Sequence, residues 1–147
     1  MNPIFTSAED AEQAFYDAIS RGDAEAMMCA WADDEEIVCI HPTGQRLTGS
    51  KAIRDSWQSI FASNPRFTVE IKTCVKWESV LLAVHSVVET LYLGDEKTPH
   101  GPMLSTNVFQ RGPHGWRLLS HHASAANPGE AHDESGVGRD AAPRTLH

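Results

Sequence analysis

The sequence predicts an α+β fold in which three N-terminal helices pack on one face of a curved antiparallel sheet. Apolar residues recur at helical spacing across residues 8–61, and they alternate with polar residues from residue 67 onward. Helices that come first and strands that come afterwards are typical of an α+β domain, whereas α/β folds alternate the two. The 147 residues are enough for one domain with a sizeable core.

Three helices are predicted, and they cover Ala8–Ser20, Ala24–Ala32 and Lys51–Phe61. Ser7 is expected to cap the first helix, because its hydroxyl can accept a hydrogen bond from the first turn. Gly22 is expected to end this helix, since glycine readily adopts the left-handed conformation of a C-terminal cap. Asp23 then follows as the cap of the second helix.

Five strands are predicted, and they cover Ile37–Ile40, Phe67–Trp77, Val80–Tyr92, Met103–Arg111 and Trp116–Ser124. A polar loop over Gly94–Pro102 and a hairpin turn over Gly112–Gly115 separate the last three. Strict alternation along the second strand predicts that Val75 and Trp77 lie on the same face as Phe67.

The closing strand, Trp116–Ser124, ends with two adjacent histidines. Neighbouring side chains on a strand point to opposite faces, so alternation places His122 on the same face as Trp116. His121 is then expected on the opposite face, at a dimer interface or in solvent. A titratable group at the end of an apolar stripe is typical of a pocket, and His122 is therefore the pocket candidate.

The composition excludes some classes of partner. The formal net charge is −8 and the pI is about 5.4, a balance that opposes binding to nucleic acid or to an anionic membrane. No secretory signal or membrane-spanning stretch is visible. The three cysteines are widely spaced in apolar segments, which is typical of free thiols in a reducing cytoplasm. We therefore expect a cytoplasmic domain over residues 1–126, followed by a flexible tail rich in Gly, Pro and charge over residues 127–147.

Several segments of the chain carry motifs of a known fold family. They are Phe15–Asp23, Trp31–Asp34, Gly49–Trp57, Thr106–Phe109 and Gly115–Ser124. Together they resemble the nuclear transport factor 2-like superfamily, in its SnoaL-like and ketosteroid isomerase-like branch, near the association domain of calcium/calmodulin-dependent kinase. The resemblance implies a cone-shaped, cystatin-like fold with the helices on the concave face of the sheet. It also implies a cavity between helices and sheet, and a homodimer that forms through the opposite sheet face.

The resemblance to ketosteroid isomerase implies a set of functional positions. That enzyme uses an aspartate base, and a tyrosine and a protonated aspartate stabilise the oxyanion. Phe15 occupies the tyrosine position here, and Tyr16 beside it is expected to point about 100° away around the helix. The base position corresponds to His41 and the protonated aspartate to Asn107. Because both oxyanion donors differ, steroid-isomerase chemistry of that type is not expected.

We predict a mostly apolar pocket that binds a small organic molecule. Its expected lining residues are Trp31, His41, Trp57, Asn107 and His122. His41 and His122 are also catalytic candidates, because histidine suits acid–base catalysis near neutral pH. The alternative function is therefore a lyase or isomerase that works by histidine-mediated proton transfer. Either histidine could instead stabilise the fold without contacting a ligand. A filled, dry interior would favour a third function, a non-catalytic association module.

No metal or cofactor is expected. His41, His85, His121 and His122 could in principle assemble a zinc or iron site, but no spaced ligand motif supports one. Glu89 lies in a strand whose two faces are both largely apolar, so alternation does not assign it to either face. If Glu89 faces the cavity, it becomes a third acid–base candidate.

Overall fold

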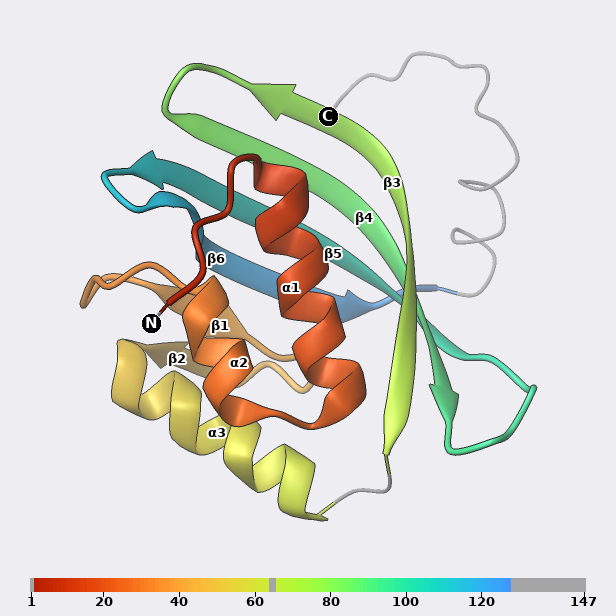
Figure 1. The fold of residues 1–147 in the computed structure, drawn as a ribbon. Helices are drawn as coiled ribbons and strands as arrows, with labels where there is room; N and C mark the ends of the chain where they lie inside the picture. The colour runs from red at the N-terminus through yellow and green to blue at the C-terminus, as the bar shows by residue number, and fades with distance from the viewer. Residues whose placement is uncertain (1, 64–65, 128–147) are drawn as a thin grey trace.

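The computed structural model confirms the predicted arrangement of three helices and a curved sheet (Figure 1). It describes residues 2–63 and 66–127, so residues 128–147 of the predicted tail lie outside the described residues. The helices are α1 (Ala8–Arg21), α2 (Ala24–Ala30) and α3 (Ser50–Ser63). The strands are β1 (Val38–Ile40), β2 (Arg46–Thr48), β3 (Phe67–Glu78), β4 (Leu82–Leu93), β5 (His100–Gly112) and β6 (Gly115–Ala125). None of the helices in these ranges is long and apolar enough to cross a membrane.

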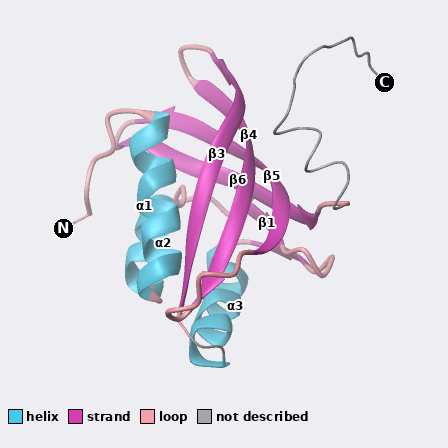
Figure 2. Cartoon of the chain, turned by 90° about the vertical axis from the view of Figure 1, so that its right-hand side faces the viewer, coloured by secondary structure: helices cyan, strands magenta, loops and turns pink. Residues whose placement is uncertain are grey.

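The strands form one sheet in the order β2-β1-β6-β5-β4-β3. Neighbouring strands are antiparallel except for β1 and β6, which run parallel. Figure 2 shows the three helices on one face of the sheet, and Figure 1 shows α1 lying across its concave side. The sequence did not predict β2, because three residues are too few to display an alternating pattern.

The ends of the first two helices follow from the residues that cap them. The Ser7 hydroxyl accepts a hydrogen bond from the backbone N–H of Asp10 at 3.0 Å. Gly22 ends α1 with a φ of 64°, a left-handed conformation that favours glycine. The Asp23 carboxylate accepts a hydrogen bond from the backbone N–H of Ala26 at 3.0 Å and so begins α2. All three predicted caps are confirmed.

A β-bulge in β6 changes the faces that the sequence predicts for the closing strand. The register between β5 and β6 shifts at Leu119, which is the extra residue on β6. The shift turns His121 toward the helices, where it is 3% exposed and its ring lies 4.8 Å from that of Phe15. His122 is exposed on the outer face of the sheet. The prediction that His122 shares the face of Trp116 is therefore wrong, as is the prediction that His121 faces a dimer partner or solvent.

A second bulge, at Cys74 in β3, changes the faces of the residues that follow it. Val75 and Trp77 point to the outer face, where they are 42% and 57% exposed. The prediction that they share a face with Phe67 is wrong, because the extra residue interrupts the alternation. Lys76, between them, instead reaches α1, as described below.

The core lies between the helices and the concave face of the sheet. The fully buried Phe15 has ring-centroid distances of 4.8–6.2 Å to Tyr16, Trp31, Trp57 and His121. Edge-to-face contacts between aromatic rings add to the stabilisation that burial provides. This aromatic cluster therefore ties the helices to β6.

Candidate functional site

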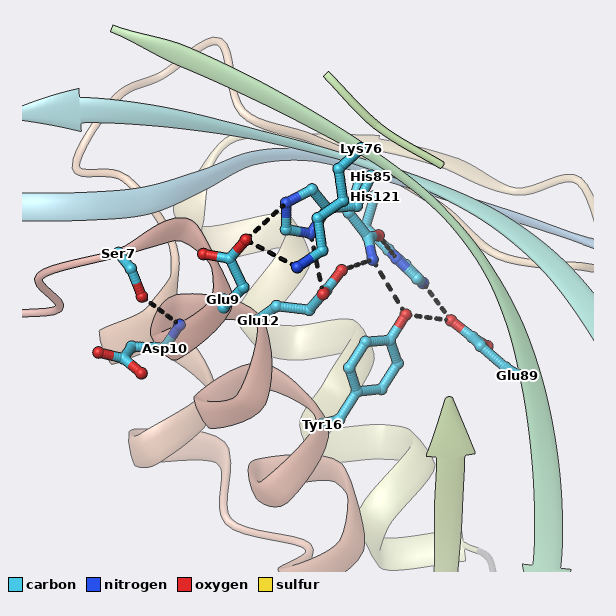
Figure 3. Close-up of polar contacts among 10 residues, drawn as sticks. Ser7, Glu9, Asp10, Glu12, Tyr16, Lys76, His85, Glu89 and His121 are labelled. Carbon is cyan, nitrogen blue, oxygen red and sulfur yellow. Dashed lines mark hydrogen bonds and ion pairs between the residues drawn. The ribbon is translucent and has the colours of Figure 1, made fainter. Parts of the chain in front are cut away.

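A group of buried polar side chains, the polar cluster, lies between α1 and the concave face of the sheet (Figure 3). Its members are Glu12 and Tyr16 of α1, His85 and Glu89 of β4, Ser105 and Asn107 of β5, and His121 of β6. Each of them is at most 6% exposed. Burying a polar group costs free energy unless it is hydrogen-bonded, so the partners of these groups determine what the cluster can do.

The spacing of these residues along their elements explains why they meet. Glu12 and Tyr16 are four positions apart, so they lie on the same face of α1. His85 and Glu89 are separated by an even number of positions in β4, and residues with this spacing share a face of a strand. The two β5 members follow the same rule. The bulge in β6 then brings His121 to this face as well.

Asn107 is the centre of the polar cluster. Its Nδ2 donates hydrogen bonds to Glu12 Oε2 at 2.9 Å and to Tyr16 Oη at 3.1 Å. Its Oδ1 lies 2.6 Å from His121 Nδ1. A carbonyl oxygen can only accept a hydrogen bond, so Nδ1 of His121 must carry a proton. In the neutral ring, Nε2 of His121 is then the nitrogen with a free lone pair.

Glu89 accepts two hydrogen bonds on the same oxygen. Tyr16 Oη donates to Glu89 Oε2 at 2.6 Å (Figure 3), and Ser105 Oγ donates to the same oxygen at 2.7 Å. The Nε2 atom of His121 lies 3.9 Å from this oxygen. A carboxyl group and an imidazole thus stand side by side in the interior.

Burial moves the pKa values of these groups in opposite directions. It raises the pKa of the Glu89 carboxyl above its ordinary value of 4.5, and hydrogen bonds from Tyr16 and Ser105 partly offset this. Burial lowers the pKa of His121 from 6.5 to about 3. It also raises the pKa of Tyr16 well above 10, with a contribution from the charge of Glu89. At neutral pH, His121 and Tyr16 are therefore uncharged.

The other end of the polar cluster reaches the surface along α1. His85 Nδ1 lies 2.9 Å from Glu12 Oε1, and His85 Nε2 lies 3.9 Å from Glu9 Oε2. Lys76 Nζ donates to Glu9 Oε2 at 2.9 Å, and this bond lowers the pKa of Glu9. A row of charged and polar groups therefore connects the solvent-exposed ion pair to the buried cluster.

His41 lies apart from the polar cluster, next to α3. Its Nε2 is 2.8 Å from Ser56 Oγ, and its ring lies 5.1 Å from that of Trp57. Burial lowers the pKa of His41, so the neutral ring is favoured. Cys39, two residues earlier, is fully buried, and burial raises the pKa of its thiol to about 12. This thiol stays protonated and does not offer a nucleophile at neutral pH.

The structure separates the five residues that the sequence predicts for the site. His41 and Trp57 are neighbours, and Asn107 belongs to the polar cluster. Trp31 is buried in the core and lines an open groove of about 1000 Å³ beside the β5–β6 hairpin. His122 lines a different, shallow hollow of about 200 Å³ on the outer face of the sheet. Trp31 and His122 therefore do not share a site with Asn107.

Sequence reasoning missed several members of the polar cluster. Tyr16 reaches the cluster although it does not occupy the position of the family tyrosine. Glu12 could have been found from its position. It lies one turn before Tyr16 on the apolar side of α1, where a glutamate is unusual because this residue type is mostly exposed. Within the described part of the chain, no group of three or more His, Cys, Asp or Glu residues is arranged to hold a metal ion.

The chain belongs to the SnoaL-like domain family, because its residues 8–128 match the sequence model of that family. Solved structures agree with this assignment. A Thiobacillus denitrificans protein described as a calcium/calmodulin-dependent protein kinase type II association domain is 37% identical, with a TM-score of 0.81 over 85% of this chain and 99% of that one. A Streptomyces avermitilis protein described as a dehydratase of the NTF2-like family is 29% identical, with a TM-score of 0.70 over 80% of this chain and 91% of that one. The predicted resemblance to the nuclear transport factor 2-like superfamily is thus confirmed.

A curated relative is longer than this chain. The F-box protein SKIP8 of Arabidopsis thaliana is 28% identical over 110 residues, which are 75% of this chain. The match covers 46% of that protein, so this chain spans about half the length of the relative.

Proposed function

We propose that this SnoaL-like domain binds a small organic molecule beside the polar cluster, and that Glu89 and His121 act on it as an acid and a base. The proposed reaction is a proton transfer of the isomerase or lyase class. Glu89 Oε2 and His121 Nε2 lie 3.9 Å apart, with a raised carboxyl pKa and a lowered imidazole pKa, and this observation carries the proposal. Adjacent groups whose environments shift their pKa values in opposite directions are typical of acid–base sites.

Each group of the cluster has a part in the proposed transfer. The neutral His121 accepts a proton from the ligand on Nε2, and the protonated Glu89 donates a proton to the ligand. Tyr16 and Ser105 donate hydrogen bonds to the carboxylate that remains, which stabilises it. The charged forms of His121 and Glu89 then attract each other, and the return of one proton from the imidazole to the carboxylate restores both groups.

Neighbouring residues supply the rest of the proposed ligand site. We infer that Trp57 and His41 border the ligand, since their rings are in contact and the Trp57 and His121 rings both pack against Phe15. Ile71 pairs with Glu89 across the sheet and offers an apolar surface on the same face. The Streptomyces avermitilis relative, described as a dehydratase, supports the lyase or isomerase class. His122, on the outer face, has no part in this site.

Proton exchange at carbon tests the proposal directly. The protein is incubated in D2O with a panel of small neutral ketones, and loss of the α-proton signals is followed by NMR. Glu89→Gln and His121→Gln are each expected to slow exchange by about 100-fold or more, as removal of a general acid or base does. His122→Gln is the matched control and should exchange like the wild type. Exchange at the wild-type rate in both site variants would refute the assignment of acid and base.

Exposed apolar residues on the outer face of the sheet favour a second candidate function, the pairing of two copies of this chain. The helices leave this face uncovered (Figure 2). The exposed apolar residues lie on the hairpin formed by β3 and β4. Trp77 and Leu82 are 57% and 45% exposed, and Val80 and Leu81 at the turn are 74% and 58% exposed. Large exposed apolar groups that lie together are typical of an interaction surface. The Thiobacillus denitrificans relative, described as an association domain, supports this candidate.

The oligomeric state tests the second candidate. We expect the wild type to sediment as a dimer, and Trp77→Lys to weaken the dimer by at least tenfold, about 1.4 kcal/mol. Ile4→Lys is the control, because Ile4 is 67% exposed but belongs to the N-terminal segment rather than to this hairpin. A monomeric wild type at all concentrations would refute the pairing. The helix-covered face of the sheet, which carries the polar cluster, takes no part in such a dimer, so the two functions are compatible.

A further inference from the structure

The directions of the hydrogen bonds in the polar cluster carry an inference about the charge of the ligand, which rests on the proposed function. We propose that this site takes an uncharged ligand, one that donates a hydrogen bond to His121 Nε2 and accepts one from Glu89. Asn107 is the positioning residue that sets this polarity.

Asn107 cannot reverse its amide without breaking the cluster. Its Nδ2 faces Glu12 Oε2 and Tyr16 Oη at 2.9 Å and 3.1 Å, and a carboxylate needs a donor at this place. Its Oδ1 is therefore fixed toward His121, and the proton of that ring is held on Nδ1. His121 can then offer a ligand only the acceptor Nε2.

Glu89 offers the complementary hydrogen-bonding function. The hydrogen bonds from Tyr16 and Ser105 both fall on Glu89 Oε2, which leaves Oε1 for the ligand. Burial raises the pKa of this carboxyl, and when Glu89 carries a proton on Oε1, that atom can donate to the ligand. His121 and Glu89 thus present one acceptor and one donor, as an amide or a hydroxycarbonyl compound requires.

The charges around the cluster disfavour an anionic ligand. In the described ranges of the chain, the ion-pair partners of Glu12 and Glu89 are His85 and His121, and burial keeps His121 neutral. The nearby Lys76 is paired with Glu9 on the solvent side. A carboxylate placed here would lie near Glu12 and would have no unpaired cation to bind, and burial of an unpaired charge is costly. An ammonium ligand would leave the donor of Glu89 without an acceptor.

Three probes of matched shape test the inference on the wild-type protein. Benzamide is neutral and carries both a donor and an acceptor, benzoate is an anion, and benzylammonium is a cation. Binding is followed through the side-chain NMR signals of His121 and Glu89. We expect benzamide to bind at least ~10-fold more tightly than either charged probe, because only benzamide can both donate to His121 and accept from Glu89 without burying a charge. The ring ¹⁵N shifts should also report a proton on Nδ1 of His121 and a bare Nε2.

A single substitution should exchange the preference. Asn107→Asp places a carboxylate beside His121, and the neighbouring charge raises the pKa of this imidazole. The ring then becomes a cation that donates from Nε2, so benzoate should gain at least ~10-fold relative to benzamide. Gln110→Glu adds the same charge at an exposed position of β5 and should leave the preference unchanged. If Asn107→Asp does not fold, the binding of the three probes to the wild type and the position of the His121 proton still test the inference about ligand charge.

The outcomes separate the two levels of the proposal. If none of the probes shifts the signals of His121 or Glu89, the proposed ligand site fails, and this inference fails with it. If a charged probe binds as tightly as benzamide, or if the proton of His121 sits on Nε2, the inference about charge is wrong while the site itself stands.

Discussion

Acid is expected to destabilise this protein through His121 and not through its neighbour His122. The ring of His121 is 3% exposed, and burial lowers its pKa from 6.5 to about 3. Above pH 6.5 the ring is neutral in both the folded and the unfolded chain, so it adds no pH dependence. As the pH falls below 6.5, the unfolded chain binds a proton that the folded chain cannot bind, and the free energy of unfolding declines until the pH reaches about 3.

The magnitude follows from the separation of the two pKa values. One unit of separation corresponds to about 1.4 kcal/mol. Between pH 6.5, the pKa of the unfolded ring, and a pH about two units lower, His121 alone should therefore remove about 2 kcal/mol from the free energy of unfolding. This is a large share of the total stability of a small domain.

Urea unfolding at neutral pH and near pH ~4.5 measures this contribution within the window set by linkage. His121→Gln keeps an amide that can donate to Asn107 but binds no proton. Its loss of stability on acidification should be smaller than that of the wild type by about 2 kcal/mol. His122→Gln is the matched control, because His122 is exposed, and it should follow the wild type. An equal acid loss in His121→Gln and the wild type would refute the buried, neutral state of His121.

Three further substitutions test the packing and the polar contacts. Tyr16→Phe removes the donor to Glu89, so it should cost about 1–3 kcal/mol and raise the pKa of Glu89 further, which ¹³C NMR titration measures. Phe15→Ala should cost about 3–5 kcal/mol in urea unfolding, because it opens a cavity at a fully buried site. Gly115→Ala should lower the melting temperature, because Gly115 has a φ of 91° and an added Cβ would lie 2.5 Å from the Phe5 carbonyl oxygen. The free energy of unfolding should fall by at least about 1 kcal/mol, and an unchanged melting temperature would contradict this prediction.

Local patterns predicted most of the fold. The helices could be placed because Ser7, Gly22 and Asp23 act within a few residues of themselves, and a cap needs no distant partner. The bulges at Leu119 and Cys74 could not be predicted, since both are ordinary strand residues and the shift arises only when two strands pair. The faces of all later residues in β3 and β6 depend on these two positions.

The site was harder to predict than the fold for the same reason. Asn107 was identified by counting along the chain, and it lies at the centre of the polar cluster. Glu89 could not be assigned to a face, because both faces of β4 are largely apolar, and only contact with Tyr16 settles it. The two histidines of β6 exchanged roles through one extra residue. Long-range pairing, rather than residue type, therefore determines which side chains meet.

The bulge at Leu119 also bears on how this chain is aligned with its relatives. The segments on either side of it are each in regular register with β5, so a relative that lacks the extra residue would bury the same side chains. Its alignment to this chain then requires a one-residue gap at that point. Ungapped counting from Trp116 would equate the wrong histidine with a relative's site residue, and deletion of Leu119 should leave His121 inside.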